Sequence, residues 1–315
     1  MTSGHRQAST QWLTVAVMTT ALVGVLVLVA FSVMLGRVRA DSTGAAVATS
    51  VPPDAFIISF TRLTGGPLEW STYSALTVRI GEALGVPVAI RFVKDVDESR
   101  MLFQAGELDA AFVSIYGYLQ ASDDCLVDLV ATPVIGGNGR EASVVVVRSD
   151  SAFTDLEDTR GSRLVATEPP SIGGYGFIAW LLAQDDETPE SFFGSVERVV
   201  SHEQSLRLLH ARAADVACVN RSQLASWSSD SFRVIATSPE FGMPPLVVSR
   251  SVDAATKERL RTAVLGFDVG SDPSAKGSQI DRFAYTAPEA YGFARAVIDF
   301  MADDGSGSVG VTHDE

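Results

Sequence analysis

Short apolar runs alternate with segments of helical periodicity along most of this chain. The apolar runs are bounded by Gly, Pro, Asp and Ser, which is typical of buried strands. Strands that alternate with helices predict an α/β fold with largely parallel sheets. We predict strands at 55–61, 86–93, 108–113, 129–134, 143–147, 163–167, 197–201, 215–220, 232–237 and 246–249, and helices at 71–84, 98–105, 174–184, 202–211, 254–265 and 288–301.

The N-terminal part has a different pattern. Residues 12–35, from Trp12 to Leu35, contain no charged residue and are long enough to cross a bilayer as a helix. A secretory signal usually has a shorter apolar core and small residues at a cleavage site. The sequence therefore favours an uncleaved membrane anchor, with a cleaved signal and a secreted or periplasmic protein as the alternative. In both cases we expect the rest of the chain to be extracytoplasmic.

The composition is that of a globular protein, with 46% hydrophobic and 20% charged residues. The net charge of −14 argues against a nucleic-acid partner, which would need a basic surface. It does not exclude a small anion, because a few backbone N–H groups can hold one inside an acidic protein. Cys125 and Cys218 are expected to be free thiols, with one disulfide as the alternative, and the histidines form no metal-binding motif.

One strand-to-helix junction combines Pro169, Pro170, Ser171, Gly173 and Gly174. The first N–H groups of a helix lack partners inside the helix, and the helix dipole favours negative charge there. Glycines allow the backbone to come close to a bound group. The junction therefore predicts a cradle for a small oxyanion. The alternative is a serine-capped helix that holds no ligand.

A second junction places His202 at the start of a predicted helix. Ser201 and Gln204 form a capping-box pattern, and Leu206 and Leu209 supply the buried face of the helix. His202 would then lie at the mouth of a sheet as a hydrogen-bond donor to a ligand. A protonated His202 would also add positive charge for an anion. The alternative is an ordinary surface histidine.

Two segments, AGELDAAFVS and ARAADVACVN, repeat one plan. Each leaves a helix, turns at an aspartate (Asp109 or Asp215) and enters an apolar strand that ends in Ser114 or Asn220. We expect the aspartates to have structural roles in turns. Ligands of open α/β sheets bind at the carboxyl ends of strands, so Ser114 and Asn220 are candidate ligand contacts.

Two further helix starts add candidates from the N-terminal half of the chain. Thr72 lies in the Ser71–Thr72 turn at the start of the helix predicted at 71–84, and is a candidate ligand contact. Tyr116 and Tyr118 cannot both face the core of one helix, so one of them is expected to offer its hydroxyl to a ligand.

In this order, the motifs resemble the extracytoplasmic substrate-binding proteins of the phosphate/phosphite/phosphonate (PhnD-like) transporter family. The similarity runs from about residue 55 to residue 301. It is carried by AGELDAAFVSIYGYLQA (105–121), VVVVRSDSAFTDLEDTRGSRLVATEPPSIGGYGF (144–177), VVSHEQSLRLLHARAADVACV (199–219) and RVIATSPEFGMPPLVVSRSVD (233–253).

The resemblance implies a type II periplasmic-binding fold, in which two α/β lobes joined by two crossover strands close on a ligand in a central cleft. The pivots would lie near 145–147 and 246–248, where apolar strands are expected to cross between the lobes. The expected organisation is a flank at 1–11, the anchor at 12–35, a linker at 36–53, lobe 1 at 54–144 and 243–302, lobe 2 at 145–242, and a disordered tail at 303–315.

The family segment that matches the first junction reads Asp-Pro-x-Ser-Thr-Ser-Gly-Tyr, and its hydroxyls and amides bind phosphonate oxygens. Ser171 keeps its hydroxyl, whereas Ile172 and Gly173 offer only backbone N–H groups. His202 and Tyr118 match a histidine and a tyrosine of the family. The departures weaken the expectation of a dianionic phosphonate and admit a different or less polar ligand.

The resemblance implies that the protein captures a small oxyanion of the phosphonate, phosphite or phosphate class and presents it to an ABC permease and its ATPase. The alternative is a membrane-tethered sensing domain that reports to a signalling partner such as a sensor kinase. Catalysis is not expected: Ser171, His202 and Asp215 are present, but neither a GxSxG nor an SxxK motif accompanies them. Nothing in the sequence indicates a cofactor or a metal.

Overall fold

The computed structural model of the protein describes residues 52, 54–61, 67–275 and 277–303. The expected flank and anchor, and nearly all of the expected linker and tail, lie outside the described residues. None of the helices in the described part of the chain is both long and apolar enough to cross a membrane. The ten predicted strands each coincide with a strand of the structure.

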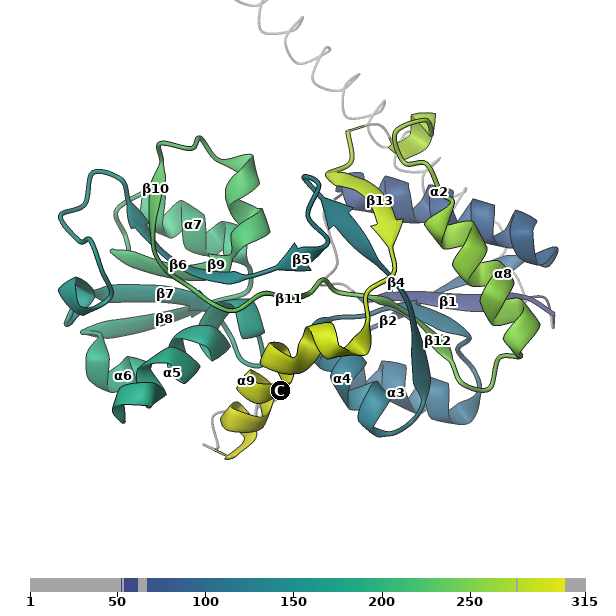
Figure 1. Ribbon diagram of the computed structural model, residues 1–315, viewed down its shortest axis with the longest axis horizontal. Helices are drawn as coiled ribbons and strands as arrows, with labels where there is room; N and C mark the ends of the chain where they lie inside the picture. The colour runs from purple at the N-terminus through teal and green to yellow at the C-terminus, as the bar shows by residue number, and fades with distance from the viewer. Residues whose placement is uncertain (1–51, 53, 62–66, 276, 304–315) are drawn as a thin grey trace, which may run out of the picture. The chain divides into compact units, whose positions relative to one another are not determined.

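The first of two sheets has six strands, and we call this sheet and its helices lobe 1 (Figure 1). Helix α2 begins earlier than predicted, and α8 has the predicted bounds. In spatial order the strands are β13 (Ile280–Ala284), β4 (Val127–Ile135), β12 (Leu246–Ser249), β3 (Ala110–Phe112), β1 (Phe56–Thr61) and β2 (Val88–Val93), and the helices are α2 (Pro67–Leu84), α3 (Val96–Ala105), α4 (Ile115–Asp123) and α8 (Ala254–Leu265).

Helices cover both faces of this sheet, because successive side chains of a strand point to opposite sides. Ala110 and Phe112 contribute to the core under α2 and α8. Ala111 contributes to the core under α3 and α4. Phe112 stacks on Phe60 with ring centroids 5.3 Å apart, which adds aromatic packing to the burial of apolar surface.

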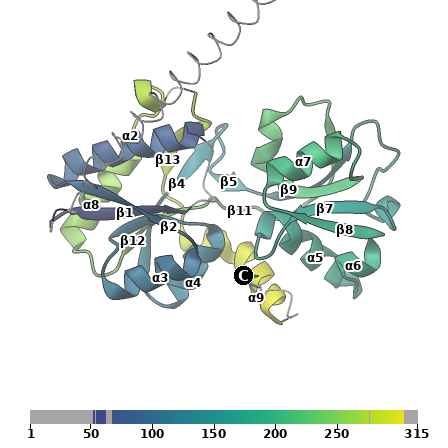
Figure 2. The same cartoon turned by 180° about the vertical axis from the view of Figure 1, so that it is seen from behind.

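The second sheet has five strands and forms lobe 2, with α7 on one face and α5 and α6 on the other (Figures 1 and 2). Helix α6 is too short to give a periodic pattern in the sequence. In spatial order the strands are β10 (Phe232–Thr237), β6 (Ser143–Arg148), β9 (Val216–Asn220), β7 (Arg163–Thr167) and β8 (Ser195–Val199), and the helices are α5 (Phe177–Leu182), α6 (Pro189–Phe192) and α7 (His202–His210).

The chain passes between the lobes at β5 (Arg140–Glu141) and β11 (Phe241–Gly242), which pair antiparallel. The residues predicted as pivots lie instead inside the sheets, at 145–147 in β6 and at 246–248 in β12. The apolar runs that suggested a crossing mark the buried strands that follow it. The crossing strands themselves are two residues long and leave no periodic signal.

Both sheets are mixed, which corrects the prediction of largely parallel sheets. Strands β7, β8 and β9 are parallel, but β6 pairs antiparallel with β9. In lobe 1, β12 pairs antiparallel with both β3 and β4. A strand that enters from the crossover starts at the edge where the parallel strands end. It must therefore run against them.

Asp109 and Asp215 have the same structural role in the two lobes. Oδ2 of Asp109 accepts a hydrogen bond from the backbone N–H of Ile57 at 2.7 Å. Oδ2 of Asp215 accepts one from the backbone N–H of Arg163 at 3.2 Å, and its carboxylate also pairs with the Arg163 guanidinium. Each aspartate thus joins the start of one strand to the start of its neighbour, which agrees with the predicted turn roles.

The C-terminal elements η6 (Pro288–Tyr291) and α9 (Gly292–Asp303) lie beside the crossover (Figure 1). The Tyr291 side chain is 1% exposed and its hydroxyl donates to the backbone carbonyl of Met243 at 2.7 Å. A Cβ at Gly242 would lie 2.4 Å from the Tyr291 ring, so only glycine fits there without a shift. Tyr291 therefore secures the returning strand of the crossover.

Replacing Tyr291 by Phe should lower the free energy of unfolding by about 1–3 kcal/mol, because the Met243 carbonyl would remain buried without its partner. Urea unfolding measures this change. Tyr285→Phe is the control, since Tyr285 is 56% exposed and its substitution should change stability by less than about 0.5 kcal/mol. Equal stability of the two variants would contradict the assignment.

Candidate functional site

Three strand ends meet at the edge of lobe 2 that faces the crossover. Strands β7, β8 and β9 are parallel, so their carboxyl ends lie at the same edge. Thr167 is paired with Val199, and Asn220 is paired with Ser143 at the beginning of β6. The segments that follow β7 and β8 carry Ser171 and His202, so the fold brings these two predicted residues to one edge of one sheet.

The turn after β7 is a π-helical segment, Ile172–Gly176, which packs closely on these strand ends. A Cβ at Gly173 would lie 1.6 Å from Oδ1 of Asn220, and a Cβ at Gly174 would lie 1.8 Å from Oγ1 of Thr167. The hydroxyl of Ser143 donates to the carbonyl of Ile172 at 3.3 Å and anchors the turn to β6. The two glycines are thus required by protein packing as well as by any approach of a ligand.

Ser171 precedes this turn and does not cap it with its side chain. Its Oγ instead accepts a hydrogen bond from Oγ1 of Thr167 at 2.7 Å. The Ser171 hydroxyl has one hydrogen of its own, and no acceptor for it is found among the described residues. Ser171 is partly exposed, so this hydrogen can be donated to a bound group. Thr167 was not predicted, although it is a polar strand end like Asn220.

His202 opens α7, which Ser201 caps by accepting from the N–H of Gln204 at 3.2 Å, as predicted. The imidazole keeps some exposed surface, but its Nδ1 is buried and has no hydrogen-bond partner among the described residues. Burial lowers the pKa of His202 from 6.5 to about 4. The imidazole is therefore neutral at pH 7, which corrects the expectation that a protonated His202 adds positive charge.

The predicted residues of lobe 1 are placed differently. Ser114 caps α4, because its Oγ accepts from the N–H of Gly117 at 3.1 Å. Thr72 is fully buried on α2, which begins at Pro67 and not after residue 70. Tyr118 is 4% exposed, its ring lies 4.7 Å from that of Tyr291, and burial raises the pKa of its hydroxyl. Residues 62–66, which precede α2, lie outside the described residues.

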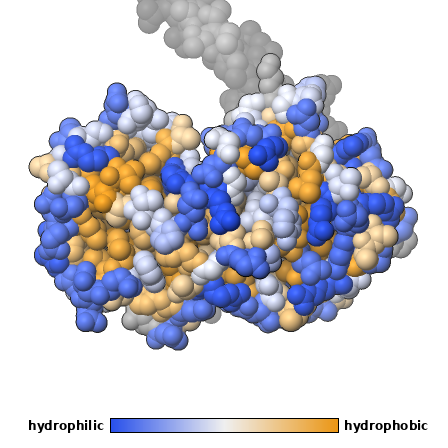
Figure 3. All heavy atoms as spheres, viewed as in Figure 1, coloured by the Kyte–Doolittle hydropathy of each residue, from blue (hydrophilic) through white to orange (hydrophobic). Residues whose placement is uncertain are grey.

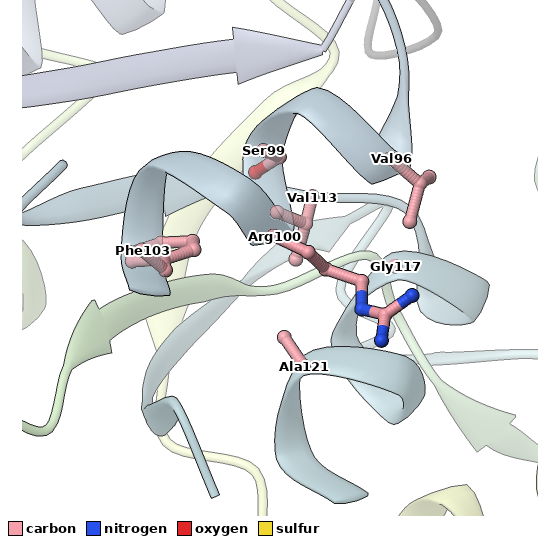
Figure 4. Close-up of a pocket in the computed structure, with 7 residues that line it drawn as sticks. All are labelled: Val96, Ser99, Arg100, Phe103, Val113, Gly117 and Ala121. Atoms are coloured by element: carbon pink, nitrogen blue, oxygen red, sulfur yellow. The ribbon is translucent and has the colours of Figure 1, made fainter. Parts of the chain in front are cut away.

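A small internal cavity lies within lobe 1, between α3 and α4 (Figure 4). Its volume is about 10 Å³, which is room for a single water molecule. Ser99 and Arg100 are the polar side chains of its wall, and Oγ of Ser99 is buried without a partner among the described residues. The cavity is too small for an oxyanion. In the described part of the chain no group of three His, Cys, Asp or Glu side chains could hold a metal ion.

The family comparison matches residues 70–291 to the model of a family described as "ABC transporter, phosphonate, periplasmic substrate-binding protein". The chain belongs to this phosphonate-binding family. The resemblance inferred from the four sequence stretches is thereby confirmed. The family consists of substrate-binding transport proteins of the periplasm. A search of curated proteins found no match.

Solved structures share the α/β fold of this chain at low sequence identity. PhnD1 from Prochlorococcus marinus, solved with methylphosphonate, has a TM-score of 0.65 and 14% identity over 80% of this chain and 99% of its own. A phosphonate-transporter binding protein from Pseudomonas aeruginosa, PA3383, has a TM-score of 0.62 and 18% identity over 81% and 90%. XAC2383 from Xanthomonas citri, solved with chloride, has a TM-score of 0.60 and 17% identity over 79% and 99%.

Replacing Gly174 by Ala should destabilise the protein by about 1–3 kcal/mol or more, because the new Cβ would overlap Thr167. Urea unfolding tests this, with Gly292→Ala as the matched control. A Cβ at Gly292 would meet nothing within 4 Å at the start of α9, so that variant should be unchanged or up to about 1 kcal/mol more stable. A tolerated Gly174→Ala would contradict the observed packing.

The lowered pKa of His202 also predicts an acid-dependent loss of stability. Between pH 6.5 and about 4 the unfolded state binds a proton at His202 that the folded state does not. The free energy of unfolding should therefore fall as the pH is lowered through this window. Urea titrations at several pH values should show a smaller fall for His202→Asn than for wild type. Parallel curves for His202→Asn and the wild type would refute the prediction.

Proposed function

We propose that this phosphonate-binding family member captures a small oxyanion of the phosphonate, phosphite or phosphate class between its two lobes, in the manner of a type II periplasmic-binding protein. The observation that carries the proposal is the edge of lobe 2, where Ser171 and His202 follow neighbouring strands. Each retains a hydrogen-bonding group that has no partner among the described residues. The surface is indented between the lobes on the side away from α9 (Figure 3).

The proposed contacts use neutral groups and backbone amides. Ser171 donates its hydroxyl hydrogen, and Gly173 and Gly174 offer N–H groups of the turn. His202 contributes a neutral imidazole, and Asn220 contributes its carboxamide from the end of β9. Short hydrogen bonds of this kind hold an anion effectively when water is excluded from around it.

From lobe 1 the proposal places Ser114, Thr72 and Tyr118 near the ligand. Ser114 supports this through the helix start that it caps, since the N–H groups of the first turn of α4 point out of the helix. Thr72 and Tyr118 are buried, so their contribution would be to position the backbone of α2 and α4.

Binding would shift the protein toward a closed form by bringing the lobes together about β5 and β11. Lobe 1 would comprise residues 54–144 and 243–302, and lobe 2 residues 145–242. The closed form would be presented to an ABC permease with its ATPase. The apolar segment at 12–35 would anchor the protein at the extracytoplasmic face of the membrane.

Calorimetry of the full chain in detergent against phosphate, phosphite and methylphosphonate tests the proposal. Ser171→Ala should weaken binding of whichever anion binds by about 1–3 kcal/mol, because a hydrogen bond to a charged group is lost. Ser229→Ala, which changes an exposed serine in the loop before β10, should bind as wild type does. Absence of binding by all three anions would overturn the proposed function, and an unaffected Ser171→Ala would remove Ser171 from the site.

A further inference from the structure

Two polar atoms at the edge of lobe 2 are buried without a hydrogen-bond partner among the described residues. They are Oδ1 of Asn220, at the end of β9, and Nδ1 of His202, at the start of α7. An unsatisfied buried polar atom costs about 1–3 kcal/mol, so native proteins rarely keep one without a reason. Their common location at the proposed site indicates that a ligand satisfies them.

The Asn220 carboxamide occupies a defined position. It fills the space where a side chain of residue 173 would lie, since a Cβ there would be 1.6 Å from Oδ1 and 2.6 Å from Cγ. Pairing of Asn220 with Ser143 holds the backbone on one side, and Ser143 also anchors the turn through the carbonyl of Ile172. The carboxamide of Asn220 therefore reaches from the end of β9 to the turn that follows β7.

The imidazole of His202 offers a second acceptor. A neutral imidazole has one nitrogen with a hydrogen and one with a lone pair, whereas the protonated form has only donors. Burial is the cause that lowers the pKa of His202 to about 4. On the same helix Glu203 pairs with Arg207, and on the packed strands Asp215 pairs with Arg163 at the far end of β9.

The charged residues close in sequence to the ends of β7 and β9 and to the start of β6 are either exposed or already paired with other protein groups. Glu168, which follows β7, is exposed. Oε1 of Glu141 accepts from the N–H groups of Ala142 and Ser222, and Arg221 pairs with Glu240. Among the described residues, no lysine or arginine forms a hydrogen bond or an ion pair with the side chain of Asn220 or His202. Recognition at this edge therefore rests on hydrogen bonds and not on an ion pair.

Asn220 ends β9 and His202 follows β8, and these two strands are separated by β7 alone. Neighbouring strands are about 4.8 Å apart, so the ends of β8 and β9 are about 10 Å apart. Ser171 and Thr167 lie between them, after and at the end of β7. A tetrahedral oxyanion with its hydrogen bonds fits this span.

We propose that Asn220 determines specificity at this edge, and that with His202 it selects oxyanions that carry an acid proton over those that do not. This inference rests on the proposed function. An anion with a P–OH group can donate its hydrogen to Oδ1 of Asn220 while its other oxygens accept from Ser171 and the turn. An anion without an acid proton would place a negative oxygen against the lone pairs of Oδ1. A site built to bond a ligand hydroxyl discriminates strongly against an analogue that lacks it.

The chemical class that follows is the monoprotonated form of a phosphorus oxyanion. The second pKa of a phosphate monoester is about 6 and that of an alkyl phosphonate is higher, about 7.5, so this form predominates near pH 5 and is the minority form at pH 8. Methanesulfonate has a shape close to that of methylphosphonate but carries no acid proton at either pH. These two probes separate the acid proton from size and from the presence of negative charge.

The test is calorimetry of the full chain with methylphosphonate and methanesulfonate at pH 5 and pH 8. Wild type should prefer methylphosphonate at pH 5 by about tenfold or more, the ratio that corresponds to one hydrogen bond of about 1.4 kcal/mol. The preference should shrink at pH 8. The pKa of His202, about 4, keeps its imidazole mainly neutral at both values.

Variants test whether Asn220 causes the preference for methylphosphonate over methanesulfonate. Asn220→Ala should bind the two probes with nearly equal affinity at pH 5. Asn220→Asp should lose methanesulfonate, because a carboxylate repels an anion that has no hydrogen to donate, whereas methylphosphonate at pH 5 can still donate its acid hydrogen to that carboxylate. Asn138→Ala, at the chain's other asparagine in the turn before β5, is the matched control and should keep the wild-type preference. Adding Gly173→Ala to Asn220→Ala should be tolerated better than Gly173→Ala alone, because the carboxamide would no longer occupy the space.

The outcomes separate this inference from the proposed function. If wild type binds neither these probes nor phosphate and phosphite, the proposed function itself fails. If wild type binds both probes equally at pH 5, selection of the acid proton is wrong while capture of an oxyanion stands. If Asn220→Ala keeps the preference, the carboxamide only fills space. The wild-type measurements decide whether the site selects the acid proton even if a variant does not fold.

Discussion

The contact of two glycines with the side chains of Asn220 and Thr167 determines the shape of the edge of lobe 2. A Cβ at either glycine would overlap these side chains, so the turn can reach the strand ends only with bare backbone. The turn then carries Ser171 at its start, with its hydroxyl held by Thr167. A larger residue at Gly173, Gly174, Thr167 or Asn220 would displace the residues packed against it, because interiors are packed too closely to absorb an extra methyl group.

The same turn is packed on the opposite side by the C-terminal helix. A Cβ at Gly176 would come within 3.0 Å of Val297 and 3.1 Å of Met301, both on α9. Phe293 of this helix stacks near Phe241 of the crossover strand β11. The helix therefore touches both the turn that carries Ser171 and one of the two strands that join the lobes. Because α9 packs against both, a movement of the crossover strand and a movement of the turn would each disturb the same contacts with this helix.

The sequence predicted the strands well because each is an apolar run with clear boundaries, and all ten were found. It missed β5 and β11, which are two residues long, and β13 (Ile280–Ala284), where Asp281 and Arg282 interrupt the apolar run. It also misplaced the crossover into β6 and β12. The sequence also did not predict which strands pair antiparallel, because periodicity indicates burial and not the direction of the neighbouring strand. The alignment of Ser171, His202 and Asn220 along one edge followed from strand ends. The burial of His202 and Tyr118 depends on tertiary contacts with elements far along the chain and left no local signal.

An acidic protein must hold an anion by short-range interactions. With a net charge of −14 the chain repels anions at long range, and salt screens this repulsion beyond about 10 Å. Many of its arginines are already engaged with carboxylates, as Arg163 is with Asp215 and Arg221 is with Glu240. Among the described residues at the edge of lobe 2, the hydroxyl hydrogen of Ser171, Nδ1 of His202 and Oδ1 of Asn220 have no partner. Their dipoles act only at contact distance. Such a site therefore discriminates between solutes by the positions of their hydrogens and lone pairs more than by their total charge.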